Sequence, residues 1–393
     1  VALTISATRR APLDAMPAAP PEPSGPATDP GTGWLQPGLV SAGAGLLAAG
    51  AVSLRVRAKG RELVWKGGAA DAAFGPRDGE TVAVRSLDHG ELAEMATIEF
   101  ESPRGLSASA GGIVHAESVH SRHQIAWLIE CAIRDEVVID QPGGTVKGSA
   151  KDMVLRRGPA EPHHAVRETL DMIFAKGSTV QLGKYDKEFA EAWKHLGDDL
   201  DSWRESSGLW DPAGHRRAGK YRLWGVVGLL VGLAVAVVGG IVAYRAGPEW
   251  LWITALGGLL GGGGFAAMIR AWELPIRTPE GSARWQQVES FRRFIANSEA
   301  RHAESAAQRG LLRHYTAWAV ALDELDHWES AVEAAAAVPG SAATSSSDFA
   351  FVAMAPAISS ATTSTFTAPS SSGGGGGGGG AGGGGGGGGG GSW

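Results

Sequence analysis

Three histidines and one glutamate lie close together in the sequence and are the first residues to test for metal chemistry. They are His115, Glu117, His120 and His123, and the last two stand three residues apart, which places them on one face of a helix. Zinc usually takes four ligands at firm spacings, and this pattern matches no such site. We therefore expect solvated or helix-start histidines here, and we predict no metal and no cofactor.

Other candidates for catalysis are equally sparse. The single cysteine, Cys131, falls on the apolar face of a predicted helix, which favours a small buried residue over a nucleophile. No phosphate-binding loop, Gly-x-Ser-x-Gly elbow, His-Glu-x-x-His motif or Ser-x-x-Lys pair occurs in the chain. The sequence therefore predicts that the protein is not an enzyme.

The elements that would position any site are dominated by membrane segments. Residues 223–244 and 250–269 carry no charged side chain, and each is long enough to cross a hydrocarbon core of about 30 Å. Residues 34–54 form a weaker third run, which contains Gln36 and Pro37. We predict a mainly α-helical membrane protein with three transmembrane helices over these ranges.

Basic residues predict the orientation, because Lys and Arg are retained on the cytoplasmic side. The loop at 245–249 holds one base and one acid. The basic residues that flank the first and second spans, and that we take to determine topology, are Arg55, Arg57, Lys59, Arg61, Arg216, Arg217, Lys220 and Arg222. This distribution predicts a multi-pass protein of the cytoplasmic (inner) membrane with its N-terminus outside and its C-terminus in the cytoplasm.

Glycine makes up 59 of the 393 residues, and many lie in the spans at a spacing of four. Gly228 with Gly232 and Gly257 with Gly261 are such pairs, as are Gly258 and Gly262. Small residues at this spacing let helix backbones approach closely in lipid, so we expect them to pack the second and third spans together; contacts between copies are the alternative. No ionisable residue lies inside a span, which disfavours a transporter.

The remaining sequence divides into four polar pieces. Residues 1–33 are Pro-rich, and we predict that they are a disordered external segment. Residues 55–222 are predicted to form a cytoplasmic domain, and residues 270–338 a helical cytoplasmic domain. Residues 339–393 are predicted to be a disordered tail, first Ser/Thr-rich and then Gly-rich. From about residue 105 the first domain is winged-helix-like. Its predicted helices are 119–134, 164–174 and 185–203, and its predicted hairpin consists of strands 137–139 and 153–156 with a turn at 141–144.

A winged helix raises the question of DNA binding. Acidic residues outnumber basic ones between residues 118 and 211, and Arg156-Arg157 is only a pair, whereas phosphate binding requires a concentrated basic face. Nucleic acid is therefore not an expected partner.

Arg292 and Arg293 in the later domain are interpreted as part of a solvated helix face, with lipid phosphates or acidic side chains as alternatives.

Several short segments occur in a characteristic order along the chain. They are Gly60-Arg-Glu62, Glu101-Ser-Pro103, Ile125-Ala-Trp-Leu-Ile-Glu-Cys-Ala-Ile-Arg134, Arg277-Thr-Pro-Glu-Gly281, Phe291-Arg-Arg293, Trp318-Ala-Val-Ala-Leu322 and the Gly-rich tail ending in Ser392-Trp393. Together they resemble one bacterial family of predicted membrane proteins, domain of unknown function 2207, over roughly residues 34–393. The resemblance implies an integral membrane protein and supplies no catalytic residue. Family members usually carry an external β-rich domain before the first span, so we expect that an upstream part is missing from this chain.

These patterns predict an inner-membrane scaffold or signalling protein with cytoplasmic domains. A transport-associated membrane subunit is the alternative, and a membrane-tethered DNA-binding regulator is a third possibility. The expected partners are membrane lipid and another protein, or a second copy of the chain.

Overall fold

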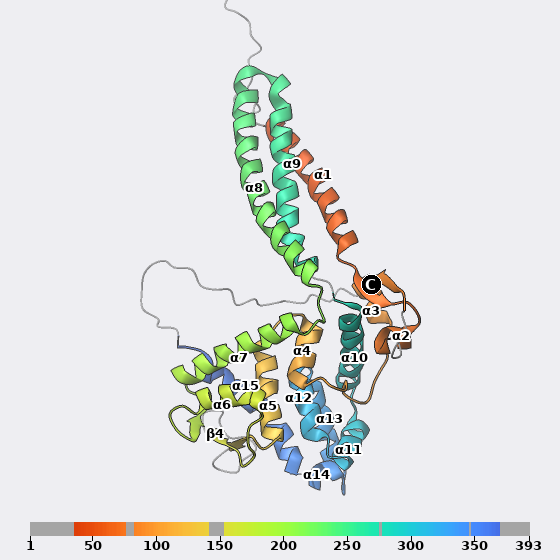
Figure 1. Cartoon of the computed structure of the whole chain (residues 1–393), viewed down its shortest axis with the longest axis vertical. Helices are drawn as coiled ribbons and strands as arrows, with labels where there is room; N and C mark the ends of the chain where they lie inside the picture. Colours follow the sequence, from red (N-terminus) through yellow and green to blue (C-terminus); the bar gives the residue numbers. More distant parts are fainter. Residues whose placement is uncertain (1–34, 76–81, 141–152, 275–276, 346, 370–393) are drawn as a thin grey trace, which may run out of the picture. The chain divides into compact units, whose positions relative to one another are not determined.

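The computed structural model describes residues 35–75, 82–140, 153–274, 277–345 and 347–369 (Figure 1). The protein is mainly helical, with two small antiparallel sheets among these residues. The chain divides into two units, one from residues 1–60 and 213–275 and the other from residues 61–212 and 276–393. We call them the membrane unit and the globular unit.

The membrane unit contains three long helices, and α1 runs alongside α9 (Figure 1). They are α1 (Leu35–Lys59), α8 (Pro212–Ala246) and α9 (Leu251–Arg270), with single 3₁₀ turns η2 (Pro248–Trp250) and η3 (Ala271–Glu273) beside α9. Large apolar side chains project from them into the surroundings: Leu46 is 75% exposed and Trp224 68%. Helices that are apolar on all faces require an apolar solvent, and all three are long and apolar enough to cross a bilayer.

The globular unit is built from chain segments on both sides of the α8–α9 hairpin. The segment before the hairpin forms β1 (Glu62–Trp65), α2 (Ala69–Phe74), β2 (Val84–Leu87), α3 (His89–Glu94), α4 (Ala108–Ala116), α5 (Ser121–Ile133), β3 (Val137–Asp140), β4 (Val154–Arg157), α6 (His164–Ile173), β5 (Thr179–Gln181) and α7 (Lys187–Ser206). The segment after it forms α10 (Pro279–Ala296), α11 (Ala300–Gln308), α12 (Leu312–Ala321), α13 (Leu325–Ala336), α14 (Ala342–Ser345) and α15 (Ser347–Phe366).

One hydrophobic core joins the two segments. It extends from Val64 to Ala361, and α12 packs against α4 and α5. The approach is close: a Cβ on Gly111 of α4 would lie 2.2 Å from the Trp318 ring of α12. The prediction of two separate cytoplasmic domains, 55–222 and 270–338, is therefore wrong, because neither segment covers its apolar face alone.

The sheets are short. β1 pairs with β2 antiparallel, and β3, β4 and β5 form a three-stranded antiparallel sheet in that order, with Ile139 opposite Leu155. The predicted hairpin strands and the three predicted helices of this region are confirmed as β3, β4, α5, α6 and α7. The predicted turn at 141–144 lies outside the described residues, and β5 was not predicted.

The segment after residue 339 differs from its prediction. Residues 342–345 and 347–366 form α14 and α15 instead of a disordered tail, and Val352, Ile358 and Ala361 are buried. Small side chains let α15 pack closely, and its hydroxyls bond to carbonyls one turn back, as Thr365 does to Ala361 at 2.7 Å. The Gly-rich end of the tail and the segment 1–33 lie outside the described residues.

Helix α15 is also long and apolar enough to be a fourth candidate span, over Asp348–Phe366. It nevertheless packs within the globular unit, against α7, α12 and α13. The backbone N–H of Gly183 donates to the Thr365 hydroxyl at 2.8 Å, and the Phe366 ring stacks on Trp193 with 5.4 Å between centroids. Its apolar face is covered by protein.

Candidate functional site

Two glycine faces of α9 hold the membrane unit together. Gly257 and Gly261 face α8: a Cβ on Gly257 would lie 2.3 Å from the Ala236 nitrogen, and a Cβ on Gly232 would lie 2.1 Å from the Gly261 nitrogen. The helices are less tightly packed at Gly228, where a Cβ would lie 3.3 Å from the Gly264 Cα. The structure thus brings the four predicted packing glycines to the α8–α9 interface, where a side chain at Gly232 or Gly257 would push the two backbones apart.

The second face of α9 packs against α1. A Cβ on Gly258 would lie 2.1 Å from the Ser41 oxygen, and one on Gly262 would lie 2.2 Å from the Gly45 oxygen. The sequence showed the spacing of Gly258 and Gly262 but did not show that α1 is their partner. Most of the glycine in α9 is therefore used for packing within one chain.

The predicted topology residues gather at one end of the membrane unit. There Val56 of α1, Ala218 of α8 and Leu274 after α9 form a small apolar cluster, against which Val52 and Tyr221 pack. The basic side chains around this cluster are exposed: Arg55, Arg57, Arg216, Arg217, Lys220 and Arg222. Arg61 is exposed as well, in the globular unit.

A buried group of charges in the described part of the globular unit surrounds Arg277, just before α10. The Arg277 side chain is 1% exposed, and its guanidinium donates to Glu62 at 2.9 Å and to Glu117 at 2.5 Å. The backbone N–H of Arg277 also donates to Glu62, at 3.2 Å. Burial raises the pKa of Glu62, and the positive charge of Arg277 offsets part of that rise.

Local chain geometry positions this cluster. Glu117 is the C-cap of α4 with φ 60°, a left-handed conformation that turns its side chain back towards Arg277. Thr278 caps α10 by accepting a hydrogen bond from Gly281 at 3.1 Å, and Pro279 begins the helix. Both partners of the Glu62–Arg277 pair lie in motifs that carry the sequence resemblance, but no sequence signal linked them, since they are 215 residues apart.

Trp285 of α10 lies between the Arg277 cluster and a second group of charges, which surrounds Glu289. The Arg277 guanidinium lies 4.9 Å from the indole centroid, and the His115 ring stacks on the indole at 6.0 Å. His115 bonds to Glu289 at 3.1 Å. Burial alone would raise the pKa of Glu289, but hydrogen bonds from His115, Arg292 and Arg293 outweigh it and hold that pKa well below its ordinary value.

Arg292 and Arg293 are structural residues. Arg292 bonds to Glu289 and to Glu324, and Arg293 bonds to Glu289 and to the carbonyls of Ala93 and Ala96. The interpretation of Arg292 and Arg293 as part of a solvated helix face is wrong. Of the two alternatives, lipid phosphates and acidic side chains, the structure shows acidic side chains as partners. These bonds tie α10 to α3 and to the loop before α13.

A metal ion fits the Arg277 cluster poorly. Glu62, His89 and Glu117 offer ligand atoms within 4.8 Å of one another. Both carboxylates already bond to Arg277, whose positive charge takes the place that a cation would need. His115, His120 and His123 do not converge either: His115 faces Glu289, whereas the His123 Nδ1 accepts from the backbone N–H of His120 at 3.1 Å.

Two candidate reactive side chains lie in the core. Cys131 is fully buried, and burial raises the pKa of its thiol, so the thiolate needed for nucleophilic chemistry is disfavoured. His123 is fully buried too, and burial, aided by the charge of Arg122, lowers its pKa to about 3. Both are therefore neutral packing residues at pH 7.

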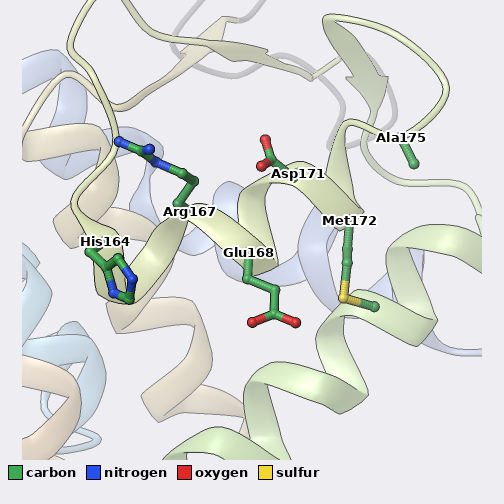
Figure 2. A pocket seen from close by; sticks show the side chains of 6 residues that line it. All are labelled: His164, Arg167, Glu168, Asp171, Met172 and Ala175. Atoms are coloured by element: carbon green, nitrogen blue, oxygen red, sulfur yellow. The ribbon is translucent and has the colours of Figure 1, made fainter.

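The surface hollows of the globular unit lack convergent catalytic groups among the described residues. Figure 2 shows one of about 540 Å³ along α6, in which Glu168 and Asp171 point away from each other. Asp171 bonds to Arg157 at 2.6 Å, and Arg167 bonds to Glu161 at 2.8 Å. This hollow is open and lined by charged side chains, in contrast to the concave and mostly apolar pockets that hold small-molecule substrates.

The fold and these sites define a class: a mainly helical membrane protein whose glycine-packed helices are joined to a polar helical unit. Comparison with protein families matches residues 97–332 to the C-terminal domain of the predicted membrane proteins of domain of unknown function 2207. The chain belongs to this family. Comparisons with curated proteins and with solved structures give no match.

Proposed function

We propose that the protein is a multi-pass bacterial inner-membrane protein whose globular unit lies in the cytoplasm and serves as a scaffold or signalling module for a protein partner, without enzymatic activity. One observation carries the topology. The globular core contains residues from both sides of the α8–α9 hairpin, so both segments lie on the same side of the membrane. The basic residues at one end of the membrane unit favour the cytoplasm for that side.

This topology requires three spans. A fourth span through α15 would have to remove Val352, Ile358 and Ala361 from the globular core and expose them to lipid. The three-span arrangement keeps them buried and leaves the C-terminus in the cytoplasm.

The interaction role rests on the arrangement of charges. Within the proposed winged-helix-like region, basic side chains pair with acids rather than form a free basic stripe: Arg156 with Asp140, Arg157 with Asp171, and Lys194 with Asp198. This favours a protein contact over DNA binding. Transport is less favoured, because glycine backbone fills the described interior of the membrane unit and no ionisable side chain lies between the helices there.

Cysteine accessibility tests the topology. In a Cys131→Ser background, Asp171→Cys and Ser364→Cys should react with a membrane-impermeant maleimide only after the inner membrane is opened, whereas Glu249→Cys should react in intact spheroplasts. Reaction of Ser364→Cys from the outer side would show that α15 spans the membrane and would refute the three-span topology.

The partner role has its own test. A photo-crosslinking residue at Glu168, on the α6 surface, should give a discrete protein adduct in native membranes. The same residue at Leu230, which is 62% exposed on a span, serves as the control. If no protein is enriched over that control, the scaffold proposal fails.

A further inference from the structure

A groove opens on the side of the membrane unit between α1 and α8, with α9 as its floor. Its volume is about 440 Å³, within the range of small-molecule sites. Gly263 leaves the floor open because it has no side chain, and Leu260 and Trp224 line the groove with apolar surface. The groove extends along α8 from Lys220 to Gly228, about 12 Å at 1.5 Å per residue.

Charge is confined to one end of this groove. Arg55 of α1 and Lys220 of α8 line that end, and no acidic residue lines the groove. Both cations are exposed, and no carboxylate of the described residues forms an ion pair with either. Tyr221 and Trp224 lie at the same end, and their amphipathic rings suit the headgroup layer.

This combination matches one kind of ligand. A negatively charged phosphate near Arg55 and Lys220 would be attracted by both positive charges, and an apolar chain attached to it would cover the groove from Trp224 towards Leu260. A free phosphate would leave the apolar part uncovered, and a zwitterionic lipid would place its own cation near the two bases. We propose that the groove binds one anionic phospholipid, with the headgroup phosphate on Arg55 and Lys220 and an acyl chain over Gly263.

The chain offers matched variants. Arg55→Gln and Lys220→Gln remove the two charges of the groove, whereas Arg222→Gln removes an equal charge from an exposed position at the same end of α8 that does not line the groove. Gly263→Leu keeps every charge and fills the floor. A Cβ at Gly263 meets only the Ala48 and Val52 methyl groups at 3.7 Å, an ordinary van der Waals distance, so the backbone accepts a side chain there, and circular dichroism checks that the leucine variant is folded.

Native mass spectrometry of the full chain in detergent, titrated with phosphatidylglycerol or phosphatidylcholine, measures the binding. We expect one tightly held phosphatidylglycerol. Each groove charge variant should weaken it about five-fold, since a base near the surface contributes about 1 kcal/mol, and Arg222→Gln should change it less than two-fold. Gly263→Leu should weaken it about ten-fold, and phosphatidylcholine should bind weakly to all variants.

Three results would overturn the proposal. Equal losses from Arg222→Gln and Lys220→Gln would indicate general surface electrostatics instead of a site. An unchanged affinity in Gly263→Leu, with circular dichroism showing a folded chain, would place the acyl chain elsewhere. Displacement of the lipid by inorganic phosphate at similar concentration would show that the headgroup alone is recognised.

Discussion

Replacing Arg277 by methionine tests whether the buried ion cluster holds the two segments of the globular unit together. The change removes the guanidinium that bonds to Glu62 and Glu117 and leaves Glu62, whose side chain is 8% exposed, without a cationic partner. Removing one partner of a buried ion pair typically costs about 3–5 kcal/mol, against a total stability of about 5–15 kcal/mol for a domain.

The local consequence is measurable by hydrogen exchange. A loss of about 3–5 kcal/mol corresponds to amide protection lower by about 100- to 5,000-fold in α4, α10 and β1, the elements that the cluster joins. Arg284→Met on α10 is the matched control. Its side chain is 32% exposed and bonds to Glu280 at 2.9 Å, so its loss should cost less than about 1 kcal/mol.

The pH dependence gives a second readout. The pKa of Glu62 is already raised by burial, and removal of Arg277 raises it further. A carboxyl group whose pKa is higher in the folded state than in the unfolded state favours folding when protonated. The defect of Arg277→Met relative to the wild type should therefore shrink as the pH falls from 7 towards 4.

A double variant separates charge from packing. Glu62→Gln with Arg277→Met contains no uncompensated charge at the pair and should be more stable than Arg277→Met alone. The reasoning is refuted if Arg277→Met costs no more than Arg284→Met, or if its defect is the same at pH 7 and pH 4.

Three further predictions follow from the packing of the helices. Gly232→Leu should separate α8 from α9 and lower the thermal midpoint of the membrane unit in detergent, whereas Gly50→Ala, where a Cβ meets nothing within 4 Å, should leave it within about 2 °C; equal midpoints would contradict the interface. Native Cys131 should react with maleimide no faster than the chain unfolds, because the thiol is buried and its pKa is raised; rapid labelling in the folded state would refute this. The folded chain holds His123 neutral, with a pKa of about 3, whereas the unfolded chain protonates it near the ordinary histidine pKa, so the free energy of unfolding should fall by about 2 kcal/mol between pH 7 and pH 5. In urea titrations His123→Gln should reduce this fall, and the same fall in both chains would argue against the prediction.

Local patterns in the sequence predicted much of the secondary structure. The uncharged runs at 223–244 and 250–269 lie within α8 and α9, because length and apolarity alone decide whether a helix suits lipid. The apolar stripe of Trp285, Val288, Phe291 and Ile295 is buried on α10, because helical periodicity assigns one face to a core. Family membership also followed from local motifs, and the match to residues 97–332 confirms it.

Long-range contacts determined the rest. Helix α15 has a composition typical of a disordered tail and, over Asp348–Phe366, a hydropathy that fits a span. Contacts with distant helices, among them α7, α12 and α13, give it a buried site. Likewise, no local pattern shows that Arg277 pairs with Glu62 or that Trp318 packs on Gly111. The sequence by itself determined which helices form and which of them suit a membrane, since those properties belong to each segment. The tertiary structure decided which segments share one core and which charges neutralise one another, since burial and ion pairing depend on neighbours that lie hundreds of residues away along the chain.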